Sequence, residues 1–115
     1  IYQMMVATTE DQDELILENT TTLKVARWWN RACDIIPCNG GKDIGIQKIL
    51  DYFNFNKEEA MAFGDGGNDI SMLKYVGTGV AMGNAKDNVK AIADYITDSV
   101  QEDGIVSALK HFEIL

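Results

Sequence analysis

Helical and strand patterns alternate along the chain beyond residue 36. Apolar residues recur from Ile46 onward at i, i+3, i+4 and i+7, which is the spacing of one face of a helix over residues 43–53. The segments 60–63 and 79–82 are short and apolar without polar alternation, as in strands buried on both faces. The remaining expected elements are helices at 68–76 and 85–93, a strand at 94–97 and a last helix marked by Ile105, Ala108, Leu109 and Phe112. This alternation predicts an α/β fold with a parallel sheet and flanking helices.

The segment before residue 36 has a different character. Short β-like runs at 2–7, 23–29 and 33–36 are separated by polar, acidic and Thr-rich stretches. This pattern favours antiparallel strands joined by loops, with one short helix around residues 11–18. We therefore expect two structural parts, an antiparallel one followed by a parallel one.

Charge and composition limit the classes of partner. The 115 residues carry a net charge of −8, from 10 basic and 18 acidic residues, which argues against nucleic acid or an anionic membrane surface. A small phosphorylated molecule remains a possible ligand, because one local Lys with a cation can offset the negative field of the whole chain.

With two cysteines (Cys33, Cys38) and one histidine (His111), a zinc site is disfavoured and free thiols in a cytoplasmic protein are expected. No stretch is apolar enough to span a bilayer. Because the chain starts at Ile1 without Met, we expect a piece of a longer protein.

The stretch GDGGND, residues 64–69, stands where the strand at 60–63 should end. Ligands bind at the carboxyl ends of strands in such sheets. Asp65 would lie at the strand tip and Asp69 in the first helical turn, while the glycines let backbone amides approach an anion. A hard cation such as Mg²⁺ needs only one or two protein carboxylates. An ordinary surface turn explains the stretch about equally well, since Gly, Asn and Asp are common turn residues. The spacing fits neither a calcium-binding EF-hand loop nor a P-loop.

Lys42 favours a binding site over a turn. It follows Gly40 and Gly41 and stands at the start of the helix expected over 43–53. A cation is poorly placed at a helix N-terminus, although a solvated side chain is the common fate of a single Lys. An anion held between Lys42 and the helix start would reverse this unfavourable placement.

Taken together, GGKDIGIQKIL, FGDGGNDISMLKYVGTGVAMGNAKDNVKAIADYIT and EDGI resemble the haloacid dehalogenase superfamily. More narrowly, they resemble its Cof-type (subclass IIB) sugar-phosphate phosphatases, which have a large α/β cap. The resemblance runs from about residue 36 to the end and is weaker before it. It implies that residues 1–35 are the C-terminal end of the cap, with antiparallel strands. Residues 36–115 would be the C-terminal half of a Rossmann-like core.

The resemblance also assigns roles to individual residues. Lys42 would be catalytic and would hold the phosphoryl oxygens, with Asn68 as a second phosphate-binding residue. Asp65 would ligate Mg²⁺. Asp69 would support the metal's water shell, which makes it both a catalytic and a metal-site residue.

One family element does not occur in these residues. The nucleophile comes from an Asp-x-Asp-Gly-Thr segment, whereas DQDEL at 11–15 lacks the Gly and the preceding apolar strand. The resemblance therefore implies that the intact protein hydrolyses small phosphorylated metabolites, such as sugar phosphates, through an aspartyl-phosphate, and that this chain alone is inactive. We expect it to associate with the missing N-terminal half of the same protein or with itself, because the strand at 60–63 would otherwise expose an unpaired edge. The alternative is a non-catalytic, truncated relative that acts as a binding or interaction module.

The sequence also predicts where a few other side chains lie. Asn84 is expected to cap the helix at 85–93, and His111 to lie on the surface. Trp28 and Trp29 are open to either sugar stacking or packing, with packing favoured for at least one of them. The methionines are expected to fill the core; they are Met4, Met5, Met61, Met72 and Met82.

Overall fold

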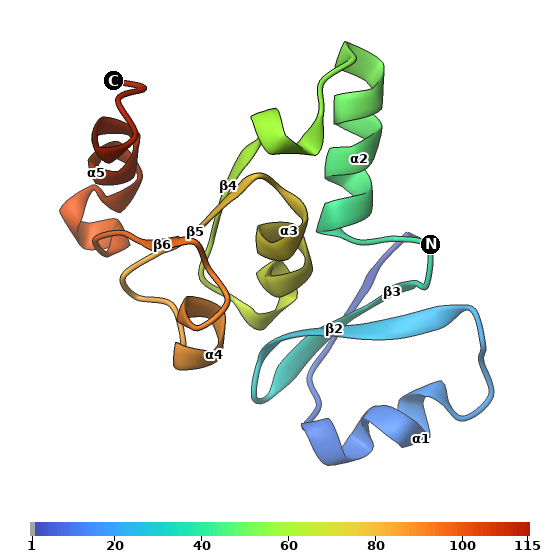
Figure 1. The fold of residues 1–115 in the computed structure, drawn as a ribbon. Helices are drawn as coiled ribbons and strands as arrows, with labels where there is room; N and C mark the ends of the chain where they lie inside the picture. Colours follow the sequence, from blue (N-terminus) through green and yellow to red (C-terminus); the bar gives the residue numbers. More distant parts are fainter. Residues whose placement is uncertain (1) are drawn as a thin grey trace.

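The structure, a computed structural model, describes residues 2–115 (Figure 1). Within them the chain forms two three-stranded sheets, an antiparallel one with strand order β1-β3-β2 and a parallel one with strand order β4-β5-β6. The expected α/β class, with antiparallel strands before a parallel sheet and its helices, is confirmed. No helix of the described part has the length and apolar character needed to cross a membrane.

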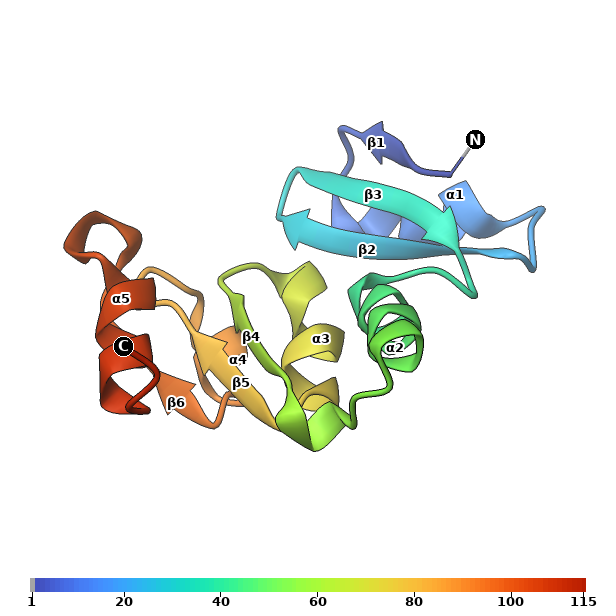
Figure 2. The same ribbon diagram turned by 90° about the horizontal axis from the view of Figure 1, so that it is seen from above.

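The antiparallel sheet is built around its central strand. Strand β3 (Ala32–Pro37) pairs with β1 (Met4–Val6) on one side and with β2 (Leu23–Trp29) on the other. The short helices η1 (Glu10–Gln12) and α1 (Asp13–Leu17) follow β1 and lie beside the sheet (Figure 2). Because β3 has a neighbour on each side, its Ala32, Cys33 and Ile35 are buried.

The parallel sheet carries the second part of the fold. Strand β4 (Met61–Gly64) pairs with β5 (Thr78–Ala81), which pairs with β6 (Tyr95–Ile96). Its helices are η2 (Lys57–Glu59), η3 (Gly67–Asp69), α3 (Ile70–Tyr75), α4 (Asp87–Lys90), η4 (Val100–Glu102) and α5 (Gly104–His111). Both ribbon views place α3 and α5 on opposite sides of this sheet, as expected for strands buried on both faces (Figures 1 and 2).

The apolar core lies between the parallel sheet and the helices α3 and α4. Leu73 of α3 is 1% exposed, and Val80 of β5 and Val89 of α4 are fully buried. The main cluster of buried residues consists of Ala62, Leu73, Val76, Ala81, Ala85 and Val89. Gly79 in β5 lets α3 approach closely, because a β-carbon there would collide with the backbone of Leu73.

Helix α2 (Lys42–Phe53) connects the two sheets and packs against α3 (Figure 2). It ends at Asn54, which adopts the left-handed conformation common after a helix. Leu50 is its buried contact, whereas Ile49 and Phe53 on the predicted apolar face remain 59% and 60% exposed. The helical period was therefore predicted correctly, but only part of its apolar face is covered by the described residues.

Two expectations about single elements and residues need correction. The helix expected at 85–93 is shorter, because α4 covers only Asp87–Lys90. Met4 and Met5 are 41% and 73% exposed, since β1 is an edge strand with a neighbour on one side only, and they do not fill a core. Met82 is buried as expected. The division between residues 1–35 and 36–115 stays a prediction, with β3 continuing to Pro37.

Candidate active site

The candidate residues meet at the carboxyl end of β4. A cavity of about 440 Å³ opens there between the loop after β4 and the end of β2. Its lining includes all four side chains predicted from the sequence, namely Lys42, Asp65, Asn68 and Asp69. Gly66, Trp28, Asn84 and Lys86 complete it. Two segments that lie apart in the sequence thus converge on one cavity.

An ion pair connects these two segments. Lys42, the first residue of α2, donates a hydrogen bond from Nζ to Oδ1 of Asp69. The Asp69 side chain is only 6% exposed, while that of Lys42 is 49% exposed. The ammonium group is therefore held in place by a buried carboxylate and still reaches the cavity. This contact accounts for a Lys at a helix start, where the helix dipole disfavours it.

Asp69 also organises the loop that carries Asp65. Its Oδ2 accepts hydrogen bonds from the backbone N–H groups of Asp65 (3.0 Å) and Gly66 (2.9 Å). A β-carbon at Gly64 would lie 2.6 Å from Cβ of Asp69, so only glycine lets the carboxylate pack under the strand end. Burial alone would raise the pKa of Asp69, but the hydrogen bonds from Lys42, Gly66 and Asp65 outweigh it and lower the pKa below its usual value.

Asp65 is exposed to the cavity and is oriented by Asn84. Asn84 donates from Nδ2 to Oδ2 of Asp65 at 3.0 Å, and its Oδ1 accepts from the backbone N–H of Val100 at 3.0 Å. The expectation that Asn84 caps the following helix is therefore wrong. The N-cap position of α4 is Lys86, and the Asn84 side chain instead ties Asp65 to the segment after β6.

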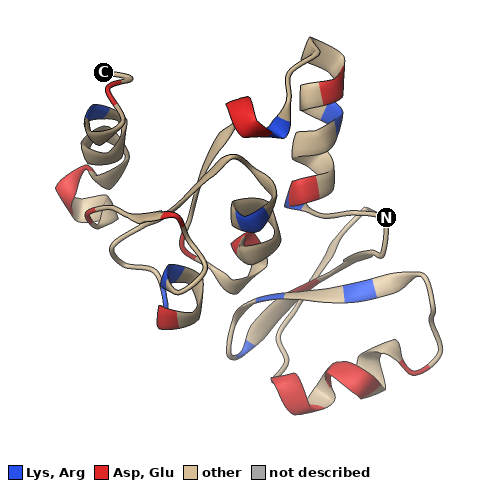
Figure 3. Ribbon diagram, in the orientation of Figure 1, with Lys and Arg blue, Asp and Glu red and all other residues tan. Residues whose placement is uncertain are grey.

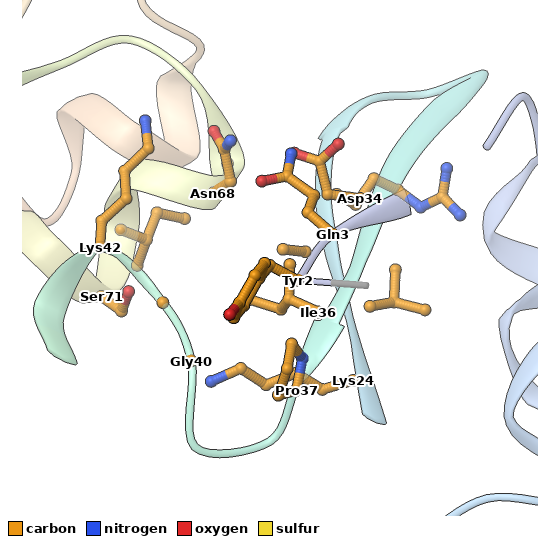
Figure 4. Close-up of a pocket in the computed structure, with 16 residues that line it drawn as sticks. Tyr2, Gln3, Lys24, Asp34, Ile36, Pro37, Gly40, Lys42, Asn68 and Ser71 are labelled. Atoms are coloured by element: carbon orange, nitrogen blue, oxygen red, sulfur yellow. The ribbon is translucent and has the colours of Figure 1, made fainter. Parts of the chain in front are cut away.

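A second, larger cavity of about 680 Å³ shares Lys42 and Asn68 with the first. Figure 4 shows Lys42, Asn68 and Ser71 facing Tyr2, Gln3, Asp34 and Ile36 across it, with Gly40 on the connecting segment. Ser71 donates a hydrogen bond to Asp43 at 3.1 Å, which ties α3 to the first turn of α2. The two cavities together offer a charged end and a roomier, mixed polar and apolar space.

The charge around these cavities differs from that of the whole chain. Figure 3 shows acidic residues along η1 and α1 and basic residues on β2. Lys24, Arg27 and Lys42 line the larger cavity together with Asp34, and Lys42 and Lys86 line the smaller one together with Asp65 and Asp69. A net charge of −8 is thus compatible with a local site for an anion.

Sequence reasoning missed several of the lining residues. Lys86 and Asn84 follow β5 and reach the cavity only because β5 lies beside β4. The sequence carried one signal for these two residues, because residues that follow neighbouring parallel strands lie at the same edge of the sheet.

Within residues 2–115 the structure contains no cluster of three or more His, Cys, Asp or Glu side chains suited to a metal ion. Both cysteines are free thiols, and His111 is exposed, as expected.

The parallel sheet, with an acidic glycine-rich loop at the carboxyl end of β4, defines an α/β domain whose candidate site lies at the strand ends. Residues 1–109 match the family of haloacid dehalogenase-like hydrolases, and the chain belongs to that family. The resemblance inferred from the motifs around Lys42 and Asp65 is thereby confirmed.

Individual members of the family show how much of this chain and of each relative is matched. The chain is 40% identical over 115 residues to YkrA of Bacillus subtilis (strain 168), covering 100% of this chain and 44% of that protein. It is 44% identical over 89 residues to 5-amino-6-(5-phospho-D-ribitylamino)uracil phosphatase YitU of the same organism, covering 75% of this chain and 33% of that one. The structure of BT4131, a sugar phosphatase of subclass IIB, matches with a TM-score of 0.92 and 45% identity, covering 99% of this chain and 44% of that chain. The chain thus spans less than half the length of these relatives.

Proposed function

We propose that this chain is the C-terminal part of a Mg²⁺-dependent phosphatase of small phosphorylated metabolites, with sugar phosphates as the substrate class. The observation that carries the proposal is the convergence of Lys42 and the loop 64–69 on one cavity. The names of two relatives support the substrate class, since BT4131 is a sugar phosphatase and YitU acts on a phosphorylated ribityl compound.

Lys42 is the residue we assign to the phosphate. Its ammonium is half-exposed at the cavity and would neutralise phosphoryl oxygens, which stabilises the charge that develops during phosphoryl transfer. Asn68 lines the same cavity and would donate hydrogen bonds to the phosphate from its amide. Asp69 has both oxygens engaged, so we assign it to positioning Lys42 and the loop, as expected for a residue that supports the metal's surroundings.

The donor set fits Mg²⁺ when phosphate and water complete it. Asp65 is exposed, lines the cavity and has one of its carboxylate oxygens oriented by Asn84. Mg²⁺ is usually held by one or two carboxylates together with waters and substrate phosphate, so the lack of a full protein cage is consistent with it. We assign Asp65 as the direct ligand and Asp69 as its support. Bound there, Mg²⁺ would supply positive charge against the phosphate dianion.

The rest of the substrate would occupy the larger cavity. That cavity adjoins the phosphate-binding residues, because Lys42 and Asn68 line both spaces. Gln3, Lys24 and Asp34 offer amide, ammonium and carboxylate groups to a polyhydroxylated molecule. Its volume of about 680 Å³ is within the usual size of small-molecule sites.

The nucleophile must come from outside these 115 residues, because they contain no Asp-x-Asp-Gly-Thr segment. YkrA and BT4131 are more than twice as long as this chain, and β4 has a strand neighbour on one side only among the described residues. Both observations support a missing N-terminal half of the same protein as the partner, with self-association as the second option. The two free thiols agree with a cytoplasmic location, which is part of the proposal.

The test begins with the reading frame that encodes this chain. If it continues upstream into an Asp-x-Asp-Gly-Thr segment, the complete protein should hydrolyse sugar phosphates with Mg²⁺. There, Lys42→Ala and Asp65→Asn should each lower kcat by about 100-fold or more, since each removes charge stabilisation of the transition state. Lys48→Ala, on the exposed side of the same helix, is the matched control.

The chain alone should not hydrolyse p-nitrophenyl phosphate above background. Normal turnover by the chain, verified by mass spectrometry, would contradict the missing nucleophile. Near-normal kcat in both site variants of the complete protein would contradict the site. A frame without the upstream segment would instead favour the non-catalytic binding module.

A further inference from the structure

The antiparallel sheet contacts the loop of the candidate site at Gly67. A β-carbon built there would lie 2.7 Å from the carbonyl oxygen of Arg27 on β2, and no side chain beyond those of the two chain neighbours lies within 4 Å of it. The obstacle is backbone, so no change of rotamer relieves it. The backbone of Gly67 does not have a positive φ, so glycine is required here for space and not for conformation.

A β-bulge brings β2 to this point. Pairing with β3 passes from Arg27–Cys33 directly to Trp29–Ala32, which makes Trp28 an extra residue in the strand. A bulge bends its strand and changes the direction in which a side chain points. Trp28 lines the cavity that holds Lys42 and Asp65, and its Cβ would be 3.8 Å from a β-carbon at Gly66. The bulge thus places an indole at the charged end of the site.

The side chain of Arg27 braces the bulge from within the antiparallel sheet. It donates from Nη1 to the carbonyl oxygens of Thr8 (2.8 Å) and Trp29 (3.3 Å), and from Nη2 to the carboxylate of Asp13. The pair with Asp13 is mostly buried, with 17% and 24% of the two side chains exposed. The backbone of Arg27 that meets Gly67 is therefore held at a fixed place in its sheet.

We propose that Gly67 is a positioning residue that lets β2 dock directly on the loop 64–69, and so sets how deep Trp28 reaches into the cavity of Lys42 and Asp65. Because the indole forms part of the wall, its depth limits the group that a phosphate bound there can carry. A side chain at position 67 holds the two parts of the fold apart and widens the cavity. The statement about the phosphate rests on the proposed function, whereas the docking contact does not.

The test measures how accessible the Trp28 indole is to a quencher in solution, and it needs no catalytic activity. The chain has two tryptophans, so Trp29→Phe leaves Trp28 as the only one. In that background, acrylamide quenching is compared between the parent, Gly67→Ala and Gly45→Ala. Gly45 lies in α2, and a β-carbon there meets nothing within 4 Å, which makes it the matched control. Trp28→Phe leaves the 51% exposed Trp29 as a reference for an accessible indole in the folded protein.

The quenching constant of Trp28 should rise in Gly67→Ala toward that of Trp29, with a shift of its emission to longer wavelength, and should not change in Gly45→Ala. Equal constants in the two folded glycine variants would overturn the proposal. Asp13→Ala gives an independent measurement that also decides if Gly67→Ala does not fold. It removes the carboxylate that accepts from Nη2 of Arg27 and should raise the same constant, and a folded Asp13→Ala protein with an unchanged constant would contradict the docking contact.

Discussion

Lys42 and Asp69, which lie 27 positions apart, form an ion pair that joins the first residue of α2 to the last residue of η3. Because Asp69 also accepts the N–H groups of Asp65 and Gly66, one buried carboxylate fixes the cationic and the acidic parts of the candidate site together. The stability of the fold and the geometry of the site are therefore coupled through this residue.

Removing the ammonium should reduce stability. In Lys42→Met, Asp69 keeps its backbone hydrogen bonds but loses its charged partner, and the free energy of unfolding should fall by about 1–3 kcal/mol. Lys48→Met on the exposed side of the same helix should have little effect. Urea unfolding measures both. Adding Asp69→Asn to Lys42→Met should recover part of the loss, because the uncompensated charge is gone, and strict additivity of the two substitutions would contradict the coupling.

Acid should weaken the contribution of the charged Asp69 carboxylate to the free energy of unfolding. The pKa of Asp69 is lowered in the folded protein, so its contribution is fully present above the unfolded value of about 3.9 and is lost as the pH falls through the folded pKa. In metal-free buffer, the stability difference between the parent and Asp69→Asn should stay constant near neutral pH and shrink below about pH 4. Thermal unfolding followed across this range checks the sign. A difference that grows on acidification would show that the carboxylate is not stabilised in its charged form.

The two thiols should differ in reactivity. Cys33 is fully buried in β3, and burial raises the pKa of its thiol, whereas Cys38 is exposed after the strand. Since the thiolate is the reactive form, a disulfide reagent at neutral pH should modify one thiol of the native chain quickly and the second only on unfolding. Cys38→Ser should abolish the fast phase. Fast labelling in that variant would show that β3 opens readily.

These contacts also show how far the sequence could predict the structure. The position of GDGGND after a buried strand was sufficient to predict a site at the end of β4, because ligands bind at the carboxyl ends of parallel strands. The proximity of Lys42 to this loop was implied only by the family resemblance, since Lys42 follows β3 of the other sheet. The role of Asn84 was not predictable in this way. Its partners, Asp65 and Val100, are 19 and 16 positions away, and the same residue type before a helix also fits an N-cap.

Irregular features of the strands were likewise missed. The bulge at Trp28 has no signature in the run Leu23–Trp29, because a bulge is defined by the partner strand. Met4 and Met5 look like core residues in the sequence and are exposed because β1 lies at a sheet edge. Periodicity thus reports which residues are apolar, and only tertiary structure decides which of them are covered.

Asn84 offers a test of the metal assignment. Asn84→Ala removes the donor that orients Asp65 and should weaken Mg²⁺ binding in the complete protein by about 10-fold, as substitutions of residues that orient metal ligands commonly do. Asn88→Ala, an exposed position in α4, is the control. Calorimetric titration measures the affinity. Unchanged affinity in Asn84→Ala, together with a loss in Asp65→Asn, would show that Asp65 binds the metal without this support.

The last prediction concerns the open edge of β4. Ala60 and Gly64 direct their carbonyls toward β5, so the alternation along the strand turns the N–H and C=O groups of Met61 and Phe63 to the side that has no strand neighbour among the described residues. Such an edge recruits other strands. The isolated chain should therefore self-associate in a concentration-dependent manner in sedimentation velocity runs.

Met61→Lys should weaken the association, whereas Leu15→Lys, at a 70% exposed position in α1, should not. The same association should disappear when an N-terminal half bearing the nucleophile strand is supplied. A parent chain that stays monomeric at every concentration, with a stability typical of complete domains, would show that β4 needs no partner.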